Sequence, residues 1–216
     1  MNVEDFDGLP LISLKDNKFT SWARFIKRCF DIKWSLLLLL LFSPLFLLAY
    51  ILLKIESFNM PVLFKQDRVG ENGRVFKIYK FRTMKHQEIE NAPSMTHDAQ
   101  DKRITAIGKL LRRTSMDEIP QLINVLKGEM SLVGPRPEQP YFVELYESQI
   151  PAFSERHRVK GGLTGWAQIN GRSALTSRPE EKLKYDLYYI ENWSLLLDIK
   201  IIIKTVFQVL TLKQVV

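Results

Sequence analysis

The sequence predicts a mainly α-helical protein with one small β-hairpin, an α+β fold in which a membrane helix is joined to a globular body. Three observations lead to this prediction. The run Trp34–Leu53 contains no charged residue, and residues 62–84 alternate apolar and polar side chains around a turn. Most of the remainder carries apolar residues at helical spacing. With 216 residues, 46% of them hydrophobic, the chain can form one domain and an anchor.

The chain is basic, with a net charge of +7 at pH 7. This balance is typical of proteins that bind nucleic acid, an anionic membrane surface or phosphorylated small molecules, although some basic surfaces have no specific partner. We expect no nucleic-acid partner, because the basic residues flank an apolar run and no aromatic–basic motif occurs. The single cysteine, Cys29, excludes an intrachain disulfide, as in a body that faces the cytosol. The histidines lack the spacing of metal ligands.

The N-terminal part divides into an arm and an anchor. Residues 1–20 combine acidic residues with Gly8 and Pro10, and we expect a loose arm. Residues 21–56 are basic near both ends and apolar between them, and we expect them to form the membrane anchor. A straight helix over Trp34–Leu53 would measure roughly 30 Å, the thickness of a bilayer core.

Ser43 and Pro44 lie in the middle of this apolar run. Proline removes a backbone hydrogen bond and predicts a bend, while the serine hydroxyl can satisfy a freed carbonyl. A straight span would place one of the two flanking basic clusters on the wrong side of the membrane. The residues alone leave two topologies open: a spanning helix, and a re-entrant helix that enters and leaves on the same face. The basic residues are Arg24, Lys27, Arg28 and Lys33 before the run and Lys54, Lys65, Arg68 and Arg74 after it.

The body is expected to begin with a β-hairpin over residues 62–84, with Glu71-Asn72-Gly73 at its turn. The polar residues 85–103 predict a mobile loop near the site. The proline-rich segment 132–140 is expected to be an ordered loop, and the glycine-rich segment 159–172 to be irregular.

Helical patterns account for most of the other residues. Residues 193–212 predict an amphipathic helix, which either lies in the membrane interface or packs on the body; the pattern fits both. The remaining helices are expected over residues 107–113, 115–127, which ends at Gly128, 141–149 and 179–191.

Adjacent carboxylates, Asp117 and Glu118, mark the candidate site. They fall at a predicted helix start, because Ser115 and Glu118 fit a capping box. Pro120 prefers the first helical turn and would move that start to about Asp117. Acidic residues at helix starts complement the helix dipole, so capping explains this pair without any catalytic role.

Two arginines favour phosphate chemistry instead. Arg136 stands between Pro135 and Pro137, so its backbone is stiff, and a guanidinium held in this way can bind phosphate through two hydrogen bonds. Arg112 lies shortly before the carboxylates. A carboxylate beside phosphate needs an intervening hard cation such as Mg²⁺, and the three groups together can form a phosphoryl-transfer site. The residues alone identify neither the donor nor the acceptor.

Long sequence blocks cover nearly all of the chain after residue 20. They are KRCFD (Lys27–Asp31), the Ser43-Pro44 break, Pro61–Met84, Leu111–Pro137, Gly162–Arg172 and Tyr185–Thr205. In these blocks the chain resembles the monotopic phosphoglycosyl transferases, also called the bacterial sugar transferase family, in their compact form. The resemblance implies a re-entrant membrane helix whose topology depends on Ser43 and Pro44. It also implies a cytosolic catalytic domain over residues 57–216, seated on the inner leaflet of the bacterial inner membrane.

The resemblance also implies a reaction: a sugar 1-phosphate moves from a UDP-sugar to polyprenol (undecaprenyl) phosphate, and UMP is released. This would be the first membrane step of capsule, exopolysaccharide or O-antigen synthesis. Asp117 would be the nucleophile that forms a phosphosugar–enzyme intermediate, with Mg²⁺ bound near it. Glu118 would take a second catalytic role, deprotonating the acceptor. Arg112 and Arg136 would contact phosphate, with Lys80 and Arg82 as weaker candidates.

A non-catalytic membrane scaffold is the alternative. It would use the basic surface only for inner-leaflet phospholipids, and it would not need both Asp117 and Glu118. The sequence does not identify the sugar or the oligomeric state, and a homodimer stays open.

Overall fold

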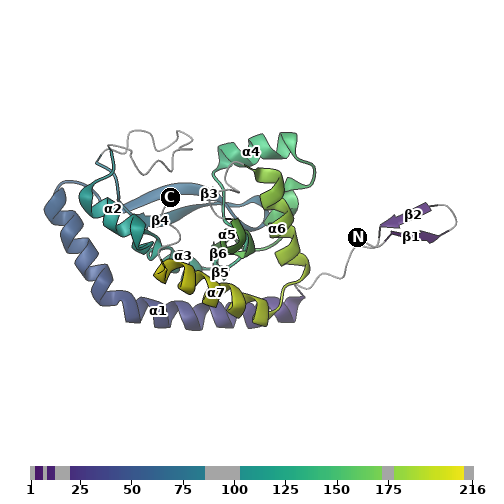
Figure 1. Cartoon of the computed structure of the whole chain (residues 1–216), viewed down its shortest axis with the longest axis horizontal. Helices are drawn as coiled ribbons and strands as arrows, with labels where there is room; N and C mark the ends of the chain where they lie inside the picture. Colours follow the sequence, from purple (N-terminus) through teal and green to yellow (C-terminus); the bar gives the residue numbers. More distant parts are fainter. Residues whose placement is uncertain (1–2, 7–8, 13–19, 86–102, 172–177, 212–216) are drawn as a thin grey trace.

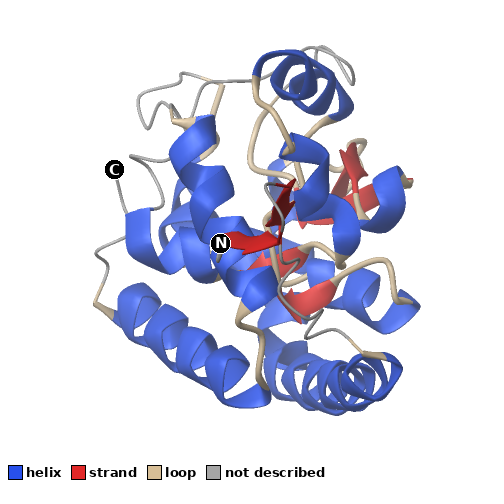
Figure 2. Cartoon of the chain, turned by 90° about the vertical axis from the view of Figure 1, so that its right-hand side faces the viewer, coloured by secondary structure: helices blue, strands red, loops and turns tan. Residues whose placement is uncertain are grey.

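The structure, a computed structural model, describes residues 3–6, 9–12, 20–85, 103–171 and 178–211. In this part of the chain a long helix, α1, lies along one side of a body of shorter helices and two-stranded sheets (Figure 1). Helices lie around the strands (Figure 2). The predicted mainly helical α+β fold is confirmed.

The described elements follow one another in this order: β1 (Val3–Phe6), β2 (Leu9–Ile12), α1 (Ser21–Glu56), β3 (Leu63–Val69), η1 (Glu71–Gly73), β4 (Val75–Phe81), α2 (Ala106–Arg113), η2 (Met116–Glu118), α3 (Gln121–Lys127), β5 (Ser131–Val133), α4 (Pro140–Gln149), η3 (Phe153–Arg158), β6 (Gly162–Thr164), α5 (Trp166–Gly171), α6 (Pro179–Glu191) and α7 (Leu195–Leu210), where η denotes a 3₁₀ turn. Within the predicted arm, β1 and β2 pair antiparallel, with Val3 opposite Ile12. The predicted loop 85–103 lies almost wholly outside the described residues.

Helix α1 continues through Pro44 and is bent, as predicted: Figure 1 shows it running along the body and then turning up beside it. The Ser43 hydroxyl donates to the Leu40 carbonyl at 2.8 Å. Leu40 is four residues before Pro44, so this is the carbonyl that the proline leaves without its helical donor. The serine therefore compensates locally for the proline.

Both ends of α1 pack on the same body. Near the N-terminal end, Lys27 Nζ lies 2.7 Å from Asp198 Oδ2 of α7, and both side chains are buried. One turn later, Asp31 accepts hydrogen bonds from the Ser131 hydroxyl and the Leu132 amide. Near the other end, Leu53 is fully buried and its carbonyl accepts from Arg82 at 3.0 Å. The apolar stretch between these contacts is only 11% buried, which makes α1 a candidate membrane anchor.

The predicted β-hairpin is confirmed. Strands β3 and β4 pair from Leu63↔Phe81 to Val69↔Val75, and Asn72 (φ 55°) and Gly73 (φ 74°) adopt left-handed conformations in the turn. On the outer edge of β4, the Asn124 side chain accepts from the Tyr79 amide at 3.0 Å. Its Nδ2 donates to the Lys77 carbonyl at 2.8 Å, so α3 is joined to this edge.

Helices α2, α4 and α6 confirm the predictions over residues 107–113, 141–149 and 179–191. Helix α7 confirms the C-terminal amphipathic helix and has two different faces. Ile201 and Asp198 are fully buried against the body, whereas Leu196 (78%), Ile203 (65%) and Phe207 (64%) are strongly exposed. The helix thus packs on the body and also presents an apolar face.

The single helix predicted over residues 115–127 is wrong. Ser115 has a left-handed conformation (φ 54°), which ends the preceding helical segment. The chain then forms the 3₁₀ turn η2, and α3 begins only at Gln121. The capping box is also wrong, because the Ser115 side chain makes no capping hydrogen bond.

The predicted loop 132–140 and irregular segment 159–172 need correction. Strand β5 pairs parallel with β6, with Ser131 opposite Gly162 and Val133 opposite Thr164, and α5 follows. A Cβ atom at Gly162 would lie 2.1 Å from the Gly134 nitrogen. The glycines therefore permit close approach of two backbones, a role that composition alone does not distinguish from irregular structure.

Candidate functional site

The candidate site lies where β4, η2 and the loop after β5 meet. Lys80 comes from β4, Asp117 and Glu118 from η2, and Arg136 from the loop. Lys80, Glu118 and Arg136 are in direct contact, although they are far apart in the sequence. The structure thus gathers most of the predicted polar residues around one short turn.

The left-handed Ser115 sets the position of the two carboxylates. Helix α2 ends at Arg113, and the Thr114 hydroxyl donates back to the Leu110 carbonyl at 2.9 Å. The chain turns at Ser115, so Asp117 and Glu118 lie on a separate 3₁₀ turn and not inside the first turn of α3. They are consequently not the capping acids that the local sequence suggests.

Glu118 is the carboxylate that pairs with cations. Lys80 Nζ donates to its Oε1 at 3.0 Å, and Arg136 Nη1 donates to its Oε2 at 3.3 Å. Arg136 Nη2 also donates to Oε1, so the arginine contacts both carboxylate oxygens. This attraction raises the pKa of Arg136, whereas burial lowers the pKa of Lys80 despite the neighbouring Glu118. Glu118 therefore holds two cations beside Asp117.

Asp117 has a different environment. No hydrogen bond or ion pair links its side chain to another of the residues that the structure describes. Burial, together with the negative charge of Glu118, raises the pKa of Asp117 to about 6. The positive charges of Lys80, Arg112 and Arg136 lower this pKa but do not cancel the rise. Adjacent carboxylates in contrasting environments can take different roles. The oxygens of Asp117 remain available to a substrate or a metal.

The other two predicted phosphate contacts lie differently. Arg112 Nε donates to the Thr83 hydroxyl at 2.9 Å, and its charge influences Asp117. Arg82 is 3% exposed and donates to the Leu53 carbonyl at the end of α1. Arg112 thus belongs to the surroundings of Asp117, whereas Arg82 joins β4 to the anchor.

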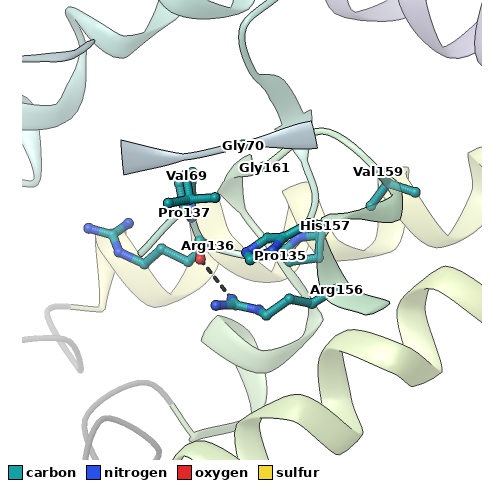
Figure 3. A pocket seen from close by; sticks show the side chains of 9 residues that line it. All are labelled: Val69, Gly70, Pro135, Arg136, Pro137, Arg156, His157, Val159 and Gly161. Atoms are coloured by element: carbon teal, nitrogen blue, oxygen red, sulfur yellow. Dashed lines mark hydrogen bonds between the residues drawn. The ribbon is translucent and has the colours of Figure 1, made fainter. Parts of the chain in front are cut away.

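Arg136 is held through its backbone as well as its side chain. Arg156 Nη2 donates to the Arg136 carbonyl at 2.8 Å and also lies 2.8 Å from Asp186 Oδ2. Figure 3 shows this bond beside a small cavity of about 10 Å³, lined by residues including Pro135, Pro137 and His157. The cavity has room for about one water molecule. The Arg136 side chain points away from it, towards Glu118.

A second acid, the partly buried Glu138, completes this support. Burial alone would raise the pKa of Glu138, but Lys182, Arg156 and Arg68 together lower it to about 2. Lys182 bonds directly to Glu138, and Arg68 Nη1 lies 3.8 Å from it. The sequence gives no local signal for this cluster, because its members lie on β3, η3 and α6 as well as beside Arg136.

The donor set near Asp117 fits only certain metals. Within the described ranges, no group of three or more histidine, cysteine or acidic side chains could enclose an ion. Mg²⁺ is often bound by one or two carboxylates together with substrate phosphates and water. A single carboxylate such as Asp117, which pairs with no cation among the described residues, fits that mode and does not fit a structural zinc site.

Comparison with known proteins identifies related sequences. Residues 22–212 match the family model described as bacterial sugar transferase. The chain is 43% identical over 210 residues to the UDP-glucose:undecaprenyl-phosphate glucose-1-phosphate transferase of Escherichia coli (strain K12), which covers 95% of this chain and 45% of that protein. It is 45% identical over 188 residues to the UDP-N-acetylgalactosamine-undecaprenyl-phosphate N-acetylgalactosaminephosphotransferase of Aeromonas hydrophila, covering 87% of this chain and 44% of that protein.

A shorter relative matches over most of its own length. The uncharacterized sugar transferase EpsL of Bacillus subtilis (strain 168) is 46% identical over 187 residues, which are 86% of this chain and 87% of that protein. By contrast, the chain spans less than half the length of the relatives from E. coli and A. hydrophila.

Proposed function

The chain belongs to the bacterial sugar transferase family, and we propose that it transfers a sugar 1-phosphate from a UDP-sugar to polyprenol (undecaprenyl) phosphate, with release of UMP. The observation that carries this proposal is the contrast between Asp117, whose oxygens are available, and Glu118, whose oxygens bind Lys80 and Arg136. The names of the relatives, which include transferases for glucose and N-acetylgalactosamine phosphates, support the substrate classes.

In the first step, an Asp117 carboxylate oxygen attacks the phosphorus that carries the sugar. A bond forms between this oxygen and phosphorus, and the bond from phosphorus to the bridging oxygen of the diphosphate breaks. UMP leaves with that oxygen and its electron pair, so a phosphosugar–enzyme intermediate remains. The carboxylate and the diphosphate are both negatively charged. This charge is offset by three nearby cations, Lys80, Arg112 and Arg136.

In the second step, a phosphate oxygen of the polyprenol phosphate attacks the same phosphorus. The bond to Asp117 breaks, its carboxylate is regenerated, and polyprenol diphosphosugar is the product. If a proton must leave the acceptor, Glu118 is the adjacent carboxylate that could accept it. Its contacts with Lys80 and Arg136 support a further role, which is to hold these cations in place.

Mg²⁺ is the proposed cofactor, and Asp117 is the residue that would hold it. When bound, the ion would screen the repulsion between an anionic carboxylate and an anionic diphosphate. Glu118 is a weaker ligand candidate because both of its oxygens already accept hydrogen bonds from cationic side chains.

We also propose that α1 is re-entrant, so that the enzyme is monotopic on the cytosolic face of the inner membrane. The contacts at both ends of α1 support this, because Lys27 and Leu53 pack on one body. A straight span would carry these two residues to opposite faces of the bilayer. The exposed apolar face of α7 would add contact with inner-leaflet phospholipids.

The test uses purified protein in vesicles and a UDP-sugar labelled on the β-phosphate. A panel of UDP-glucose, UDP-galactose and their N-acetylated forms should include one that yields UMP and labelled protein when Mg²⁺ is present. Chelation should stop labelling and added Mg²⁺ should restore it. Asp117→Asn should lose activity by on the order of 10⁴-fold or more, as expected when a nucleophile is removed. Lipid binding without any UMP release would favour the scaffold alternative, and UMP release unchanged in Asp117→Asn would remove the nucleophile assignment.

A further inference from the structure

Two arginines hold consecutive carbonyls of the loop that carries Arg136. Arg156 donates to the Arg136 carbonyl at 2.8 Å, and Arg68 Nη1 donates to the Pro137 carbonyl at 3.0 Å. Arg68 comes from β3, so this bond fixes its guanidinium beside the loop. The second terminal nitrogen of Arg68 is left to bind another group.

That second nitrogen orients the amide of Gln66. Arg68 Nη2 donates to Gln66 Oε1 at 2.7 Å. Because a guanidinium has only donors, the hydrogen-bond network assigns the amide oxygen to this contact, and the amide nitrogen must point away from Arg68. Among the residues that the structure describes, this nitrogen has no hydrogen-bond partner. Gln66 therefore presents an uncharged donor in a fixed orientation.

The register of the hairpin places Gln66 on the face that carries Lys80. Phe64 lies opposite Lys80, and Gln66 follows Phe64 by two residues, so all three side chains share one face. From this face Lys80 reaches Glu118. The Gln66 amide thus belongs to the same surface as the cations of the candidate site.

Arg68 and Gln66 lie beyond the Glu118–Arg136 pair as seen from Asp117. Burial raises the pKa of Asp117 and lowers the pKa of Arg68, and the charges of Glu118 and Arg136 act on both groups. This ion pair therefore lies between the two side chains. In phosphoryl transfer the attacking and leaving oxygens are roughly in line. When Asp117 attacks, the leaving phosphate consequently lies on the side where Arg68 and Gln66 stand.

We propose that the Gln66 amide nitrogen donates to the phosphate that lies opposite Asp117, with Arg68 as the positioning residue that orients this amide. The inference rests on the proposed function and adds a residue to it. In the first step this phosphate belongs to the leaving UMP. In the second step the polyprenol phosphate must displace Asp117 from the same phosphorus, so its phosphate enters from the same side. One subsite with Gln66 therefore serves both phosphates in turn.

An uncharged donor suits a subsite that two anions must enter and leave. Its hydrogen bond stabilises the negative charge that the UMP phosphate gains as its bond to phosphorus breaks. Because the amide carries no net charge, it holds the product less strongly than another lysine or arginine would. The amide neither gains nor loses a proton in this role.

Two substitutions at one position separate this contact from a purely structural role. Gln66→Glu keeps an oxygen for Arg68 but replaces the amide donor with a negative charge, whereas Gln66→Leu removes both polar atoms. Asp67→Asn is the matched control. Asp67 is the next residue, on the opposite face of the hairpin, where it pairs with the exposed Lys77.

Two KM values are measured on purified protein in vesicles. The KM for UMP comes from the exchange of labelled UMP into the UDP-sugar, and the KM for undecaprenyl phosphate comes from product formation. Gln66→Leu should raise both by about tenfold, corresponding to about 1.4 kcal/mol of lost binding. Gln66→Glu should raise both further, because its charge repels phosphate. Asp67→Asn should keep the wild-type values.

Wild-type KM values in Gln66→Glu would overturn the inference, because they would show that only the oxygen facing Arg68 matters. A rise for UMP alone, or for undecaprenyl phosphate alone, would overturn the shared subsite. Labelling of each variant by the UDP-sugar without acceptor verifies that it is folded. A wild type that forms no phosphosugar–enzyme would remove the proposed function itself, which is a different outcome from unchanged KM values in the variants.

Discussion

Arg136 contacts both carboxylate oxygens of Glu118, and this ion pair joins the loop after β5 to the turn that carries Asp117. Lys80 reaches the same carboxylate from β4. Three separate segments are therefore held together by the acid that stands next to the proposed nucleophile.

Glu118→Gln should weaken the hold on Lys80 and Arg136. It also removes a charge that raises the pKa of Asp117, so that pKa should fall from about 6. If Glu118 mainly positions cations, the first half-reaction should slow and the KM for the UDP-sugar should rise. If it acts only as a base for the acceptor, labelling by the UDP-sugar should be normal and only the second half-reaction should slow. Rapid-quench measurement of both half-reactions checks this, with the exposed Glu144→Gln as control.

Asp117→Asn should stabilise the protein at neutral and alkaline pH. The pKa of Asp117 in the folded protein is raised to about 6 from its ordinary value of 3.8, so folding penalises the charged form of this carboxyl. The penalty is fully present above about pH 6 and disappears as the pH falls towards 4, and it amounts to at most about 2–3 kcal/mol. Thermal unfolding of the metal-free protein in detergent should show a higher Tm for Asp117→Asn at pH 8. The gain in Tm of Asp117→Asn over the wild type should be larger at pH 8 than at pH 4.5. An equal gain at the two pH values would contradict the raised pKa of Asp117.

Arg156→Met should destabilise the fold by about 3–5 kcal/mol, because the buried Asp186 would lose its cationic partner and Glu138 would lose one of its neighbouring cations. Arg158→Met is the control. Arg158 pairs with Glu155 on the surface, where each side chain is 47% exposed, and its loss should cost less than about 1 kcal/mol. Denaturant unfolding of the two variants measures the difference. Equally small losses of unfolding free energy in Arg156→Met and Arg158→Met would show that the buried network does not support Arg136.

Replacing Ser43 and Pro44 with leucine should straighten α1 and convert the proposed re-entrant helix to a span. The proline removes a helical donor and the serine satisfies the Leu40 carbonyl, so both contributions to the bend would disappear. Exposed Cys29 reports on one flank, and Ile55→Cys, at a position 77% exposed, reports on the other. A membrane-impermeant maleimide should reach both sites from the same side in the parent protein and from opposite sides in the double-leucine variant. Both sites remaining on one side would contradict the prediction.

Local patterns predict much of this fold. The alternation around Glu71-Asn72-Gly73 indicates the hairpin, and helical spacing indicates α2, α4, α6 and α7, because these signals depend on neighbouring residues. The position of the Ser43-Pro44 bend follows for the same reason. The break at Ser115 could not be predicted, because S-x-x-E is as compatible with a helix start as with a left-handed turn.

Local patterns predict less of the candidate site than of the fold. The sequence indicates Asp117, Glu118 and Arg136 as candidate residues, but it does not show that Glu118 pairs with cations whereas Asp117 does not. That distinction depends on contacts across 18 and 38 residues of the chain. The parallel pairing of β5 with β6 and the cluster around Arg156 and Glu138 are similarly non-local.

The buried pair between Lys27 and Asp198 joins residues 171 positions apart. At a synthesis rate of about 5–20 residues per second, Lys27 leaves the ribosome roughly ten to thirty seconds before its partner. During this interval the docking surface on α7 does not yet exist. The N-terminal part of α1 can therefore dock on α7 only after nearly the whole chain has been synthesised, so this contact is among the last to form during biosynthesis.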